Sequence, residues 1–267
     1  TGSRLKELGQ VLNKDKEQVY APSKAISDMW GKINPHYEGK VGPTVVDLGV
    51  GHHAPHRASP NRAGRVGDTI RGVEKIGKLP LPPKQKAIAI KMAAQSKCMY
   101  GVATDPLTGG QINKVRSSYV GALWKDKKPV SKEAAMLIIG KGEMDPWLGQ
   151  VRRTLDNWKR QVRHGLPETV KKVWGGLGRL VGRVSGPINH LHRTLNKLGW
   201  KVDGVDTYID ENGASRKITD NDDLVEDGLG RARDVMWTAI AKTRSNSAGV
   251  ERGADEHTTT SYFSSLG

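Results

Sequence analysis

The sequence predicts a mostly α-helical protein with a small α/β segment at its N-terminus and a β-hairpin near its C-terminus. Between residues 65 and 198, apolar side chains recur at the three- and four-residue spacing of one helix face. Residues 44–50 are instead apolar and β-branched, as in a strand. Residues 201–218 alternate around Asn212-Gly213, a strong hairpin-turn sequence. The expected segments are an α/β segment with one or two strands (1–63), a basic helical domain (64–200), the hairpin with a terminal helix (201–244), and a tail that is disordered or ordered by a partner (245–267).

The first elements follow from the turn residues between them. We expect one strand at 44–50 and then an extended loop at 51–63, because that stretch holds three His, two Pro and two Arg residues. A helix at 65–77 should end before a cluster of three prolines. A second helix should run from Lys84 to about Met99.

Three helix starts carry capping residues. Thr108-Gly-Gly-Gln111 has the form of a capping box, in which a hydroxyl and an amide satisfy free backbone N–H groups. Ser131 is a candidate N-cap for a short helix that ends at Gly140. Asp145 followed by Pro146 supplies an N-cap and a first-turn proline for the next helix.

The helix after Asp145 has the clearest amphipathic pattern. Its apolar stripe is Val151, Leu155, Trp158 and Val162, and its cations lie off that stripe. Residues 170–184 repeat the arrangement around Trp174, although glycines weaken the helix. Further helices should carry the apolar sets Ile188, Leu191, Leu195 and Leu198, and then Leu224, Leu229, Ala232, Met236 and Ile240.

Composition favours a basic protein that does not span a membrane. The chain has 267 residues, 43 Lys+Arg against 28 Asp+Glu, and a formal net charge of +15. Its mean hydropathy is −0.56, and no run approaches the roughly 18 apolar residues of a spanning helix. The single cysteine, Cys98, cannot form an internal disulfide, which favours a reducing compartment or an organelle matrix. Because the sequence starts at Thr1, we expect a processed or truncated N-terminus.

The positive charge is concentrated, and this predicts a polyanionic partner. Residues 151–201 hold twelve Lys and Arg residues and only two acids. From residue 202 to the end, the net charge is negative. Such clustering is the electrostatic footprint of nucleic-acid binding, with a solvated basic surface as the alternative. The candidate RNA-binding residues are Arg57, Arg62, Arg65, Arg71, Arg152, Arg153, Lys159, Arg160, Arg163, Lys171, Lys172, Arg179 and Arg183. The acidic segment around Asp220 to Asp227 should face away from RNA, toward a protein or solvent.

Three other patterns suggest chemistry. Val46 to Ala54 satisfies Gly-x-Gly-x-x-Ala after a strand and is similar to the first motif of methyltransferases, but Pro55 and Pro60 disfavour the helix that such a site needs. Three histidines, at 52, 53 and 56, could bind zinc, but no Cys or carboxylate pair is nearby. The acids at 220–227 could suggest a nuclease, although charges there also complement a helix dipole. We therefore expect no catalytic residues, metal or cofactor.

Several stretches together resemble one enzyme family. They are Leu12-Asn13-x-x-Lys16, Leu48-Gly49-Val50, Ile76-Gly77-Lys78-Leu79-Pro80, Lys86 to Gly101, Val115 to Trp124, and Gly186-Pro187 through Leu198-Gly199-Trp200. In pattern and order they resemble the palm end, thumb and post-thumb region of non-LTR retrotransposon reverse transcriptases. The resemblance implies a thumb-like helical bundle that tracks a nucleic-acid backbone, with a palm remnant before it.

Lys16 matches a family lysine near the incoming nucleotide, but the Tyr-Ala-Asp-Asp type strand that carries the catalytic aspartates does not precede it in this sequence. We therefore expect a non-enzymatic RNA-binding component of a large ribonucleoprotein, most simply a mitochondrial ribosomal protein derived from a retroelement. The expected partners are RNA, with ribosomal RNA as the first expectation, and neighbouring proteins, with no membrane and no small-molecule substrate. The nucleus or cytoplasm is the alternative location. A fragment or split subunit of an active reverse transcriptase is the alternative function, and a methyltransferase is the third.

Overall fold

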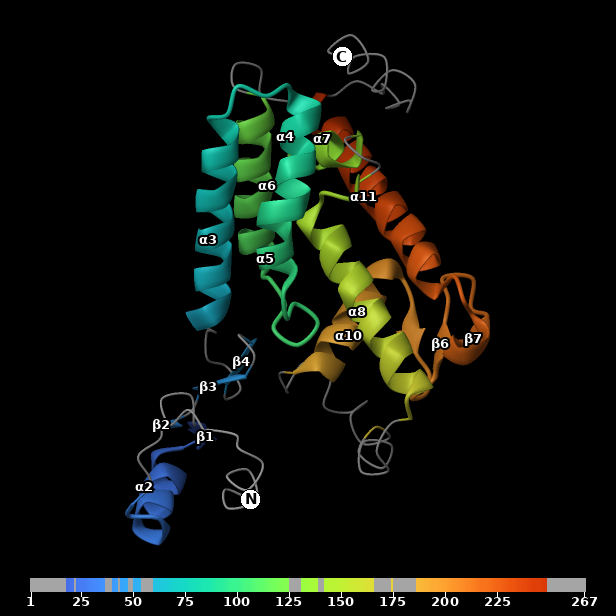
Figure 1. The fold of residues 1–267 in the computed structure, drawn as a ribbon. Helices are drawn as coiled ribbons and strands as arrows, with labels where there is room; N and C mark the ends of the chain where they lie inside the picture. The colour runs from blue at the N-terminus through green and yellow to red at the C-terminus, as the bar shows by residue number, and fades with distance from the viewer. Residues whose placement is uncertain are drawn as a thin grey trace. The chain divides into compact units, whose positions relative to one another are not determined.

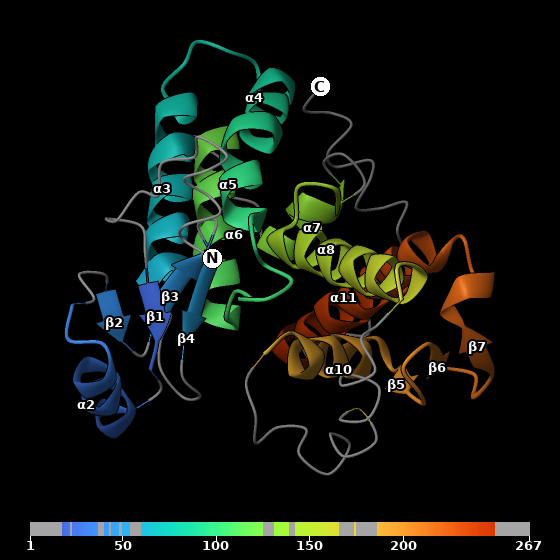
Figure 2. The ribbon, with the colours of Figure 1, turned by 60° about the horizontal axis from the view of Figure 1, so that its bottom comes forward.

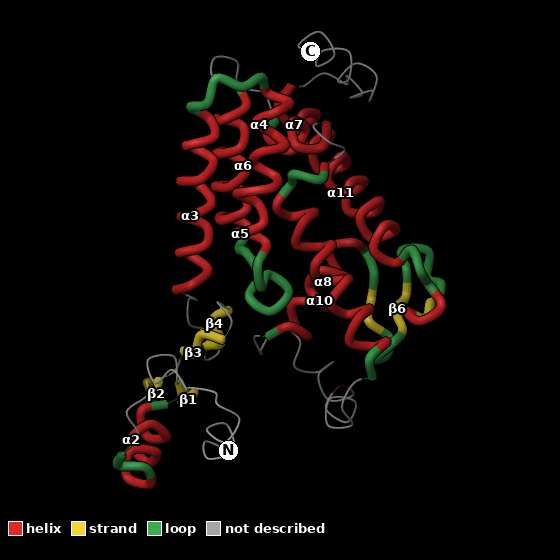
Figure 3. Tube along the Cα trace, viewed as in Figure 1, coloured by secondary structure: helices red, strands yellow, loops and turns green. Residues whose placement is uncertain are grey.

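A computed structural model gives the fold and divides the chain into two compact units, Thr1–Ala63 and Gly64–Gly267. The structure describes residues 18–21, 23–36, 40–42, 44–47, 50–53, 60–124, 131–138, 142–165, 174 and 186–248. Helix dominates the described residues, as the sequence predicts (Figure 3).

The described residues of the first unit form two strand pairs and one helix. Strand β1 (Gln18–Tyr20) pairs in parallel with β2 (Lys40–Gly42), and helix α2 (Lys24–Ile33) makes the crossover between them that a parallel pair requires. Ser23 caps α2, because its hydroxyl accepts a hydrogen bond from the backbone N–H of Ile26 at 3.4 Å.

The predicted single strand at 44–50 is wrong. Strand β3 (Thr44–Asp47) pairs in antiparallel fashion with β4 (Val50–His53), and the register sets Asp47 opposite Val50. The chain therefore reverses inside the apolar run. The predicted loop at 51–63 is also too long, because β4 continues to His53 and the next helix already begins at Pro60. The continuous apolar pattern hid the turn.

The second unit is built from helices and one small sheet. Its helices are α3 (Pro60–Gly77), α4 (Pro83–Ala89), the π-helix η2 (Ile90–Gln95), α5 (Ser96–Met99), α6 (Gly109–Leu123), α7 (Lys132–Ile138), α8 (Pro146–Arg163), α10 (Pro187–Leu198) and α11 (Leu224–Ala248), with a 3-10 turn η4 (Ile218–Asp220). Helices α3, α6 and the α4–α5 segment lie side by side, and α8, α10 and α11 pack together beside them (Figures 1 and 2). None of the helices in the described ranges is long and apolar enough to cross a lipid bilayer.

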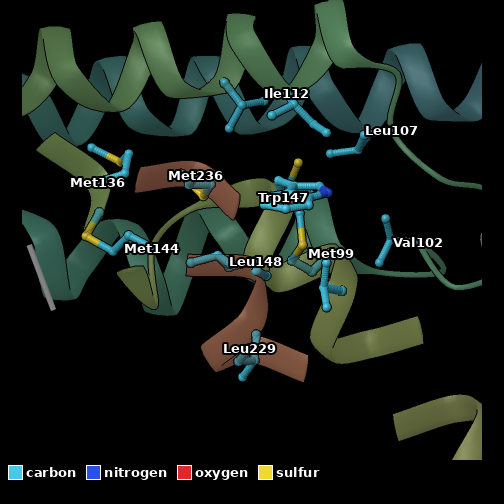
Figure 4. Close-up of a cluster of buried hydrophobic side chains, with 14 of the residues drawn as sticks. Met99, Val102, Leu107, Ile112, Met136, Met144, Trp147, Leu148, Leu229 and Met236 are labelled. Atoms are coloured by element: carbon cyan, nitrogen blue, oxygen red, sulfur yellow. The ribbon is translucent and has the colours of Figure 1, made fainter. Parts of the chain in front are cut away.

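One apolar cluster unites all these helices. It extends from Val66 on α3 to Ile240 on α11 and includes Leu155 and Leu195, which are fully buried. Figure 4 shows part of it, where side chains from α5, α6, α7, α8 and α11 meet. The predicted segment at 201–244 packs into this same core, because Tyr208 is buried within it.

The predicted helix starts are confirmed at three sites. Thr108 and Gln111 form both hydrogen bonds of the capping box at α6. The Ser131 hydroxyl accepts from the N–H of Ala134 at α7. The Asp145 carboxylate caps α8, and Pro146 occupies its first turn.

The segment predicted as one helix from Lys84 to Met99 is continuous but not uniformly α-helical. A π-helical stretch, η2, separates α4 from α5. The buried residues there are Ile90, Ala94, Gln95, Cys98 and Met99. Spacings of four and five residues between them suit the wider π turn, which keeps them on one face where a regular α-helix would rotate them away.

The predicted hairpin is confirmed and gains a third strand. Strands β6 (Thr207–Ile209) and β7 (Ser215–Lys217) pair in antiparallel fashion, and β5 (Lys201–Val202) pairs with β6. Gly213 has φ of 83°, which suits glycine. The Asp210 carboxylate holds the turn, because it accepts from two backbone N–H groups of the loop.

The last helix extends past the expected end of the folded region. Helix α11 continues to Ala248, so residues 245–248 are helical and not tail. Residues 249–267 lie outside the described part of the chain. Of the helix predicted at 170–184, only Trp174 is described; it is helical and packs against the core next to His192.

Candidate nucleic-acid interface

The basic side of α8 is formed as the sequence predicts. Val151, Leu155 and Trp158 are buried, so the opposite side of the helix faces outward. The five cations predicted to bind RNA from this helix are Arg152, Arg153, Lys159, Arg160 and Arg163, and all but the half-buried Lys159 are exposed. The helix therefore presents cations to solvent from Arg152 to its last residue, Arg163.

Part of this charge is already matched inside the molecule. Arg152 Nη2 lies 2.8 Å from Glu226 Oε1, on the first turn of α11. Arg163 forms an ion pair with Asp222, and Lys159 Nζ lies 3.7 Å from the same carboxylate. The acidic segment therefore lies against the basic helix, whereas the sequence prediction separated the two.

The pairing divides the α8 cations into two kinds. Arg152, Lys159 and Arg163 each have a carboxylate partner. Arg160 donates to the Asn157 side chain at 3.0 Å, and Arg153 has no partner among the described residues. Exposed ion pairs of this kind contribute about 0–1 kcal/mol each and weaken with salt, so a phosphate can replace the carboxylate.

Helix α3 does not present its arginines as one surface. Arg65 turns inward, with its side chain 10% exposed, and its Nη2 lies 2.9 Å from the buried Asp105 carboxylate. Its prediction as an RNA-binding residue is therefore corrected to a structural role. Arg71 pairs with Asp68 one turn before it, and Arg62 is half-buried. Buried salt bridges stay closed because breaking one strands a charge in the interior.

The remaining predicted cations cannot be placed. Arg57, Lys171, Lys172, Arg179 and Arg183 lie outside the described residues.

The structure also brings together cations that the sequence did not connect. A cleft of about 410 Å³ opens between η2, the turn before α8, α8 itself and α11. Four basic side chains line it: Lys91, Arg152, Arg153 and Arg233. Lys91 and Arg233 were missed, since each lies on a helix whose basic residues form no conspicuous run. No sequence signal joins two positions that are 142 residues apart.

One acid lies among these cations. Glu143 forms an ion pair with Lys91, and a hydrogen bond from Lys91 is the main reason why the pKa of Glu143 is lowered. The charges of Arg152 and Arg233 lower this pKa further. Glu143 is thus held in its ionised form and offers one negative charge to a cleft with four cations.

The floor of the cleft is apolar and rigid. Met99, Leu148 and Leu229, which lie together in the cluster of Figure 4, line it from α5, α8 and α11. Gly149 allows α8 to approach α5, because a Cβ there would lie 2.8 Å from the Met99 sulfur. The floor therefore combines close packing with a rim of positive charge.

A buried amide completes the cleft. Gln95 on η2 donates from Nε2 to the Glu143 carbonyl oxygen at 3.0 Å, and its Oε1 has no partner among the described residues. Lys91 and Gln95 both lie on the π-helix η2, four residues apart, and both line this edge. Single π turns inside α-helices are frequent at functional sites.

Other reactive groups do not form a catalytic cluster in the described part of the chain. Burial raises the pKa of the Cys98 thiol to about 11, so it is protonated at neutral pH. Among the described residues, no three His, Cys, Asp or Glu side chains are grouped to hold a metal ion. His56 and the side chains of His52 and His53 lie outside the described set. Of the acids at 220–227, only Glu226 and Asp227 belong to the first turn of α11.

The methyltransferase motif lacks its structural context. A cofactor turn of that type joins a strand to the N-terminus of a helix, where backbone N–H groups face the ligand. Here β3 is followed by β4, and Gly51 is within that strand. The third function suggested by the sequence is therefore not supported.

Comparison with family models, with curated proteins and with solved structures gives no match to this chain.

Proposed function

We propose that this chain is an RNA-binding protein that grips the sugar–phosphate backbone through the outer side of α8 and the cleft beside it. The observation that carries the proposal is the convergence of Lys91, Arg152, Arg153 and Arg233 from three helical segments on one cleft. Lys and Arg side chains neutralise phosphates and release counterions, which supplies most of sequence-independent affinity.

The composition of the site favours contacts to the sugar–phosphate backbone of RNA over recognition of its bases. The residues that line the cleft include no aromatic side chain on which a base could stack. Arginine and lysine dominate its rim, and contacts of these residues to phosphate fix position without reading sequence. The net charge of +15 adds long-range attraction to any polyanion.

The resemblance to non-LTR reverse transcriptases would explain the evolutionary origin of this RNA-binding surface. On this proposal the helices of the second unit are a thumb-like bundle, the first unit is a palm remnant, and the protein is a non-enzymatic part of a large ribonucleoprotein. A mitochondrial ribosome is the particle we propose, because it would need a basic protein with both RNA and protein neighbours.

A second candidate is a fragment or subunit of an active reverse transcriptase. The order of the resembling stretches along the chain favours it, because they follow one another as palm end, thumb and post-thumb do. A primer–template extension assay with divalent metal separates the two candidates. The chain alone should extend no primer, and extension would favour the polymerase.

Binding can be tested on the purified chain with labelled 20-nucleotide RNA by fluorescence anisotropy between 50 and 200 mM salt. The variant Arg152→Ala/Arg153→Ala should bind more weakly, and the slope of log affinity against log salt should fall by about 0.7 for each lost phosphate contact.

A matched control removes the same charge elsewhere. Lys75→Ala/Lys78→Ala takes two exposed cations from the end of α3 and the turn after it, and neither of them lines the cleft beside α8. Equal loss of affinity in both double variants would show that net charge, and not the α8 surface, carries the binding.

A further inference from the structure

We propose that the cleft beside α8 holds one nucleotide of the bound strand and that Glu143 occupies its cations when RNA is absent. This inference rests on the proposed function and names the site at which a phosphate of the RNA binds. It concerns Lys91, Arg152, Arg153 and Arg233 on the rim and the apolar floor beneath them.

The charges of the cleft fit a phosphate. Four cations line it, against Glu143 in the cleft and Glu226, which pairs with Arg152, so the cations outnumber these two acids. Arginine forks and lysine both bind phosphate oxygens by charge-assisted hydrogen bonds. The backbones that carry these cations belong to helical segments of the packed second unit, so binding must order only the exposed side chains.

The size and floor of the cleft fit more than a phosphate. A volume of about 410 Å³ lies within the range of small-ligand sites. Met99, Leu148 and Leu229 offer an apolar surface to a ribose or base edge, and the Gln95 amide lies at the side. A concave site of this kind takes an unstacked nucleotide, which a single strand offers and a regular duplex does not.

Glu143 is placed to compete with a phosphate for the cations of the cleft. Its carboxylate accepts a hydrogen bond from Lys91, as a phosphate oxygen would, and its side chain is half exposed and can turn outward. It lies in the turn just before α8, and its backbone carbonyl is tied to Gln95. The backbone can therefore stay in place while the side chain leaves.

The test uses the full chain and a single-stranded RNA 20-mer, with two matched pairs of variants. Glu143→Gln removes the competitor and should tighten binding about two- to fivefold, the range of one exposed ion pair. Glu74→Gln removes the same charge from an exposed site on α3 and should change affinity less.

The second pair removes a cation. Lys91→Met should weaken binding and lower the salt slope by about 0.7. Lys75→Met, also on an exposed helix surface, should leave the slope almost unchanged. Thermal unfolding of each variant reports whether it folds, and these exposed positions should leave the unfolding temperature nearly constant.

The outcomes separate the inference from the proposed function. If the unmodified chain binds no RNA, the proposed function fails and this inference fails with it. If it binds RNA but each cleft variant behaves like its control, the cleft assignment is overturned, while RNA binding through the outer side of α8 stands. Strands with 5′-hydroxyl and 5′-phosphate ends distinguish an internal phosphodiester from a terminal phosphate, and either preference supports the site when the cleft variants differ from their controls.

Discussion

Two ion pairs in this molecule use the same chemistry in different surroundings. Arg116 on α6 forms two hydrogen bonds to Asp145, of 2.6 and 3.0 Å, and the Asp145 side chain is 0% exposed. Arg163 on α8 pairs with Asp222, whose side chain is 86% exposed. Both are arginine–carboxylate pairs, yet only the first is shielded from water.

The difference separates structural charge from charge that is free to bind. Asp145 also accepts hydrogen bonds from the backbone N–H groups of Trp147 and Leu148, so it cannot leave Arg116 without uncapping α8. Asp222 sits in solvent, where the attraction is screened and a phosphate can displace it. Burial, and not residue type, therefore decides which arginines are accessible to an external anion.

The strongest test of this contrast removes each carboxylate in turn. Asp145→Ala leaves Arg116 buried without its main partner and uncaps α8, so the free energy of unfolding should fall by about 3–5 kcal/mol. Asp222→Ala should cost less than about 1 kcal/mol. Urea denaturation of both variants measures the difference. Similar losses would mean that burial does not distinguish the two pairs.

The buried side of α8 allows a second test by packing. Leu155 is fully buried against Gly228 on α11, where an added Cβ would overlap its side chain. Leu155→Ala should cost about 2–5 kcal/mol. Gly228→Ala should cost about 1–3 kcal/mol alone and less in the Leu155→Ala background, because the smaller side chain leaves room. Additive costs in the double variant would contradict this contact.

A third test uses pH and a buried histidine. Burial, with smaller contributions from the cations Lys197 and Arg193, lowers the pKa of His190 to about 4. The unfolded chain binds the proton more readily, so stability is full above pH 6.5 and is lost as the pH falls toward 4. The loss should reach about 3 kcal/mol.

The matching variant is His190→Gln, which cannot gain this proton. Its free energy of unfolding should be lower at pH 7 but should fall less than that of the unmodified chain between pH 6.5 and 4. Chemical denaturation at several pH values measures both curves. Parallel curves would show that His190 does not titrate in this window.

The smallest expected effect concerns the exposed pair itself. Asp222→Asn should alter stability by less than about 1 kcal/mol but free Arg163 and Lys159, and so tighten RNA binding about two- to fivefold. Asp156→Asn, on an exposed side of α8 with no ion-pair partner among the described residues, is the control. Equal gains from both variants would indicate a net-charge effect.

The sequence predicted the parts of the fold that depend on interactions between residues close in the chain. The capping residues at Thr108, Ser131 and Asp145, the apolar stripe of α8 and the Asn212-Gly213 turn each act within a few residues, and each is confirmed. The reversal inside 44–53 was missed because both strands are apolar enough to look like one.

The candidate site was predicted only in part, because it depends on distant contacts. The pattern identified the basic side of α8. It could not show that Arg65 points inward to Asp105, which lies 40 residues away, or that Asp222 returns to α8. The cleft depends on Lys91 and Arg233, which meet only after η2 and α11 have packed against α8.

The π-helix carries a consequence for insertions and deletions in this chain. A π turn holds about one residue more than an α turn, and each residue rotates a helix by about 100°. Deletion of one residue between Ile90 and Gln95 would therefore restore a regular α-helix without breaking the chain's path. The wider turn accommodates that residue, so α4 and α5 would keep their core-facing sides after the deletion, and the change would fall on η2 itself, which carries Lys91 and Gln95. The cleft beside α8 therefore depends on a single extra residue, and a length change that most surface helices tolerate at their ends would remove it here.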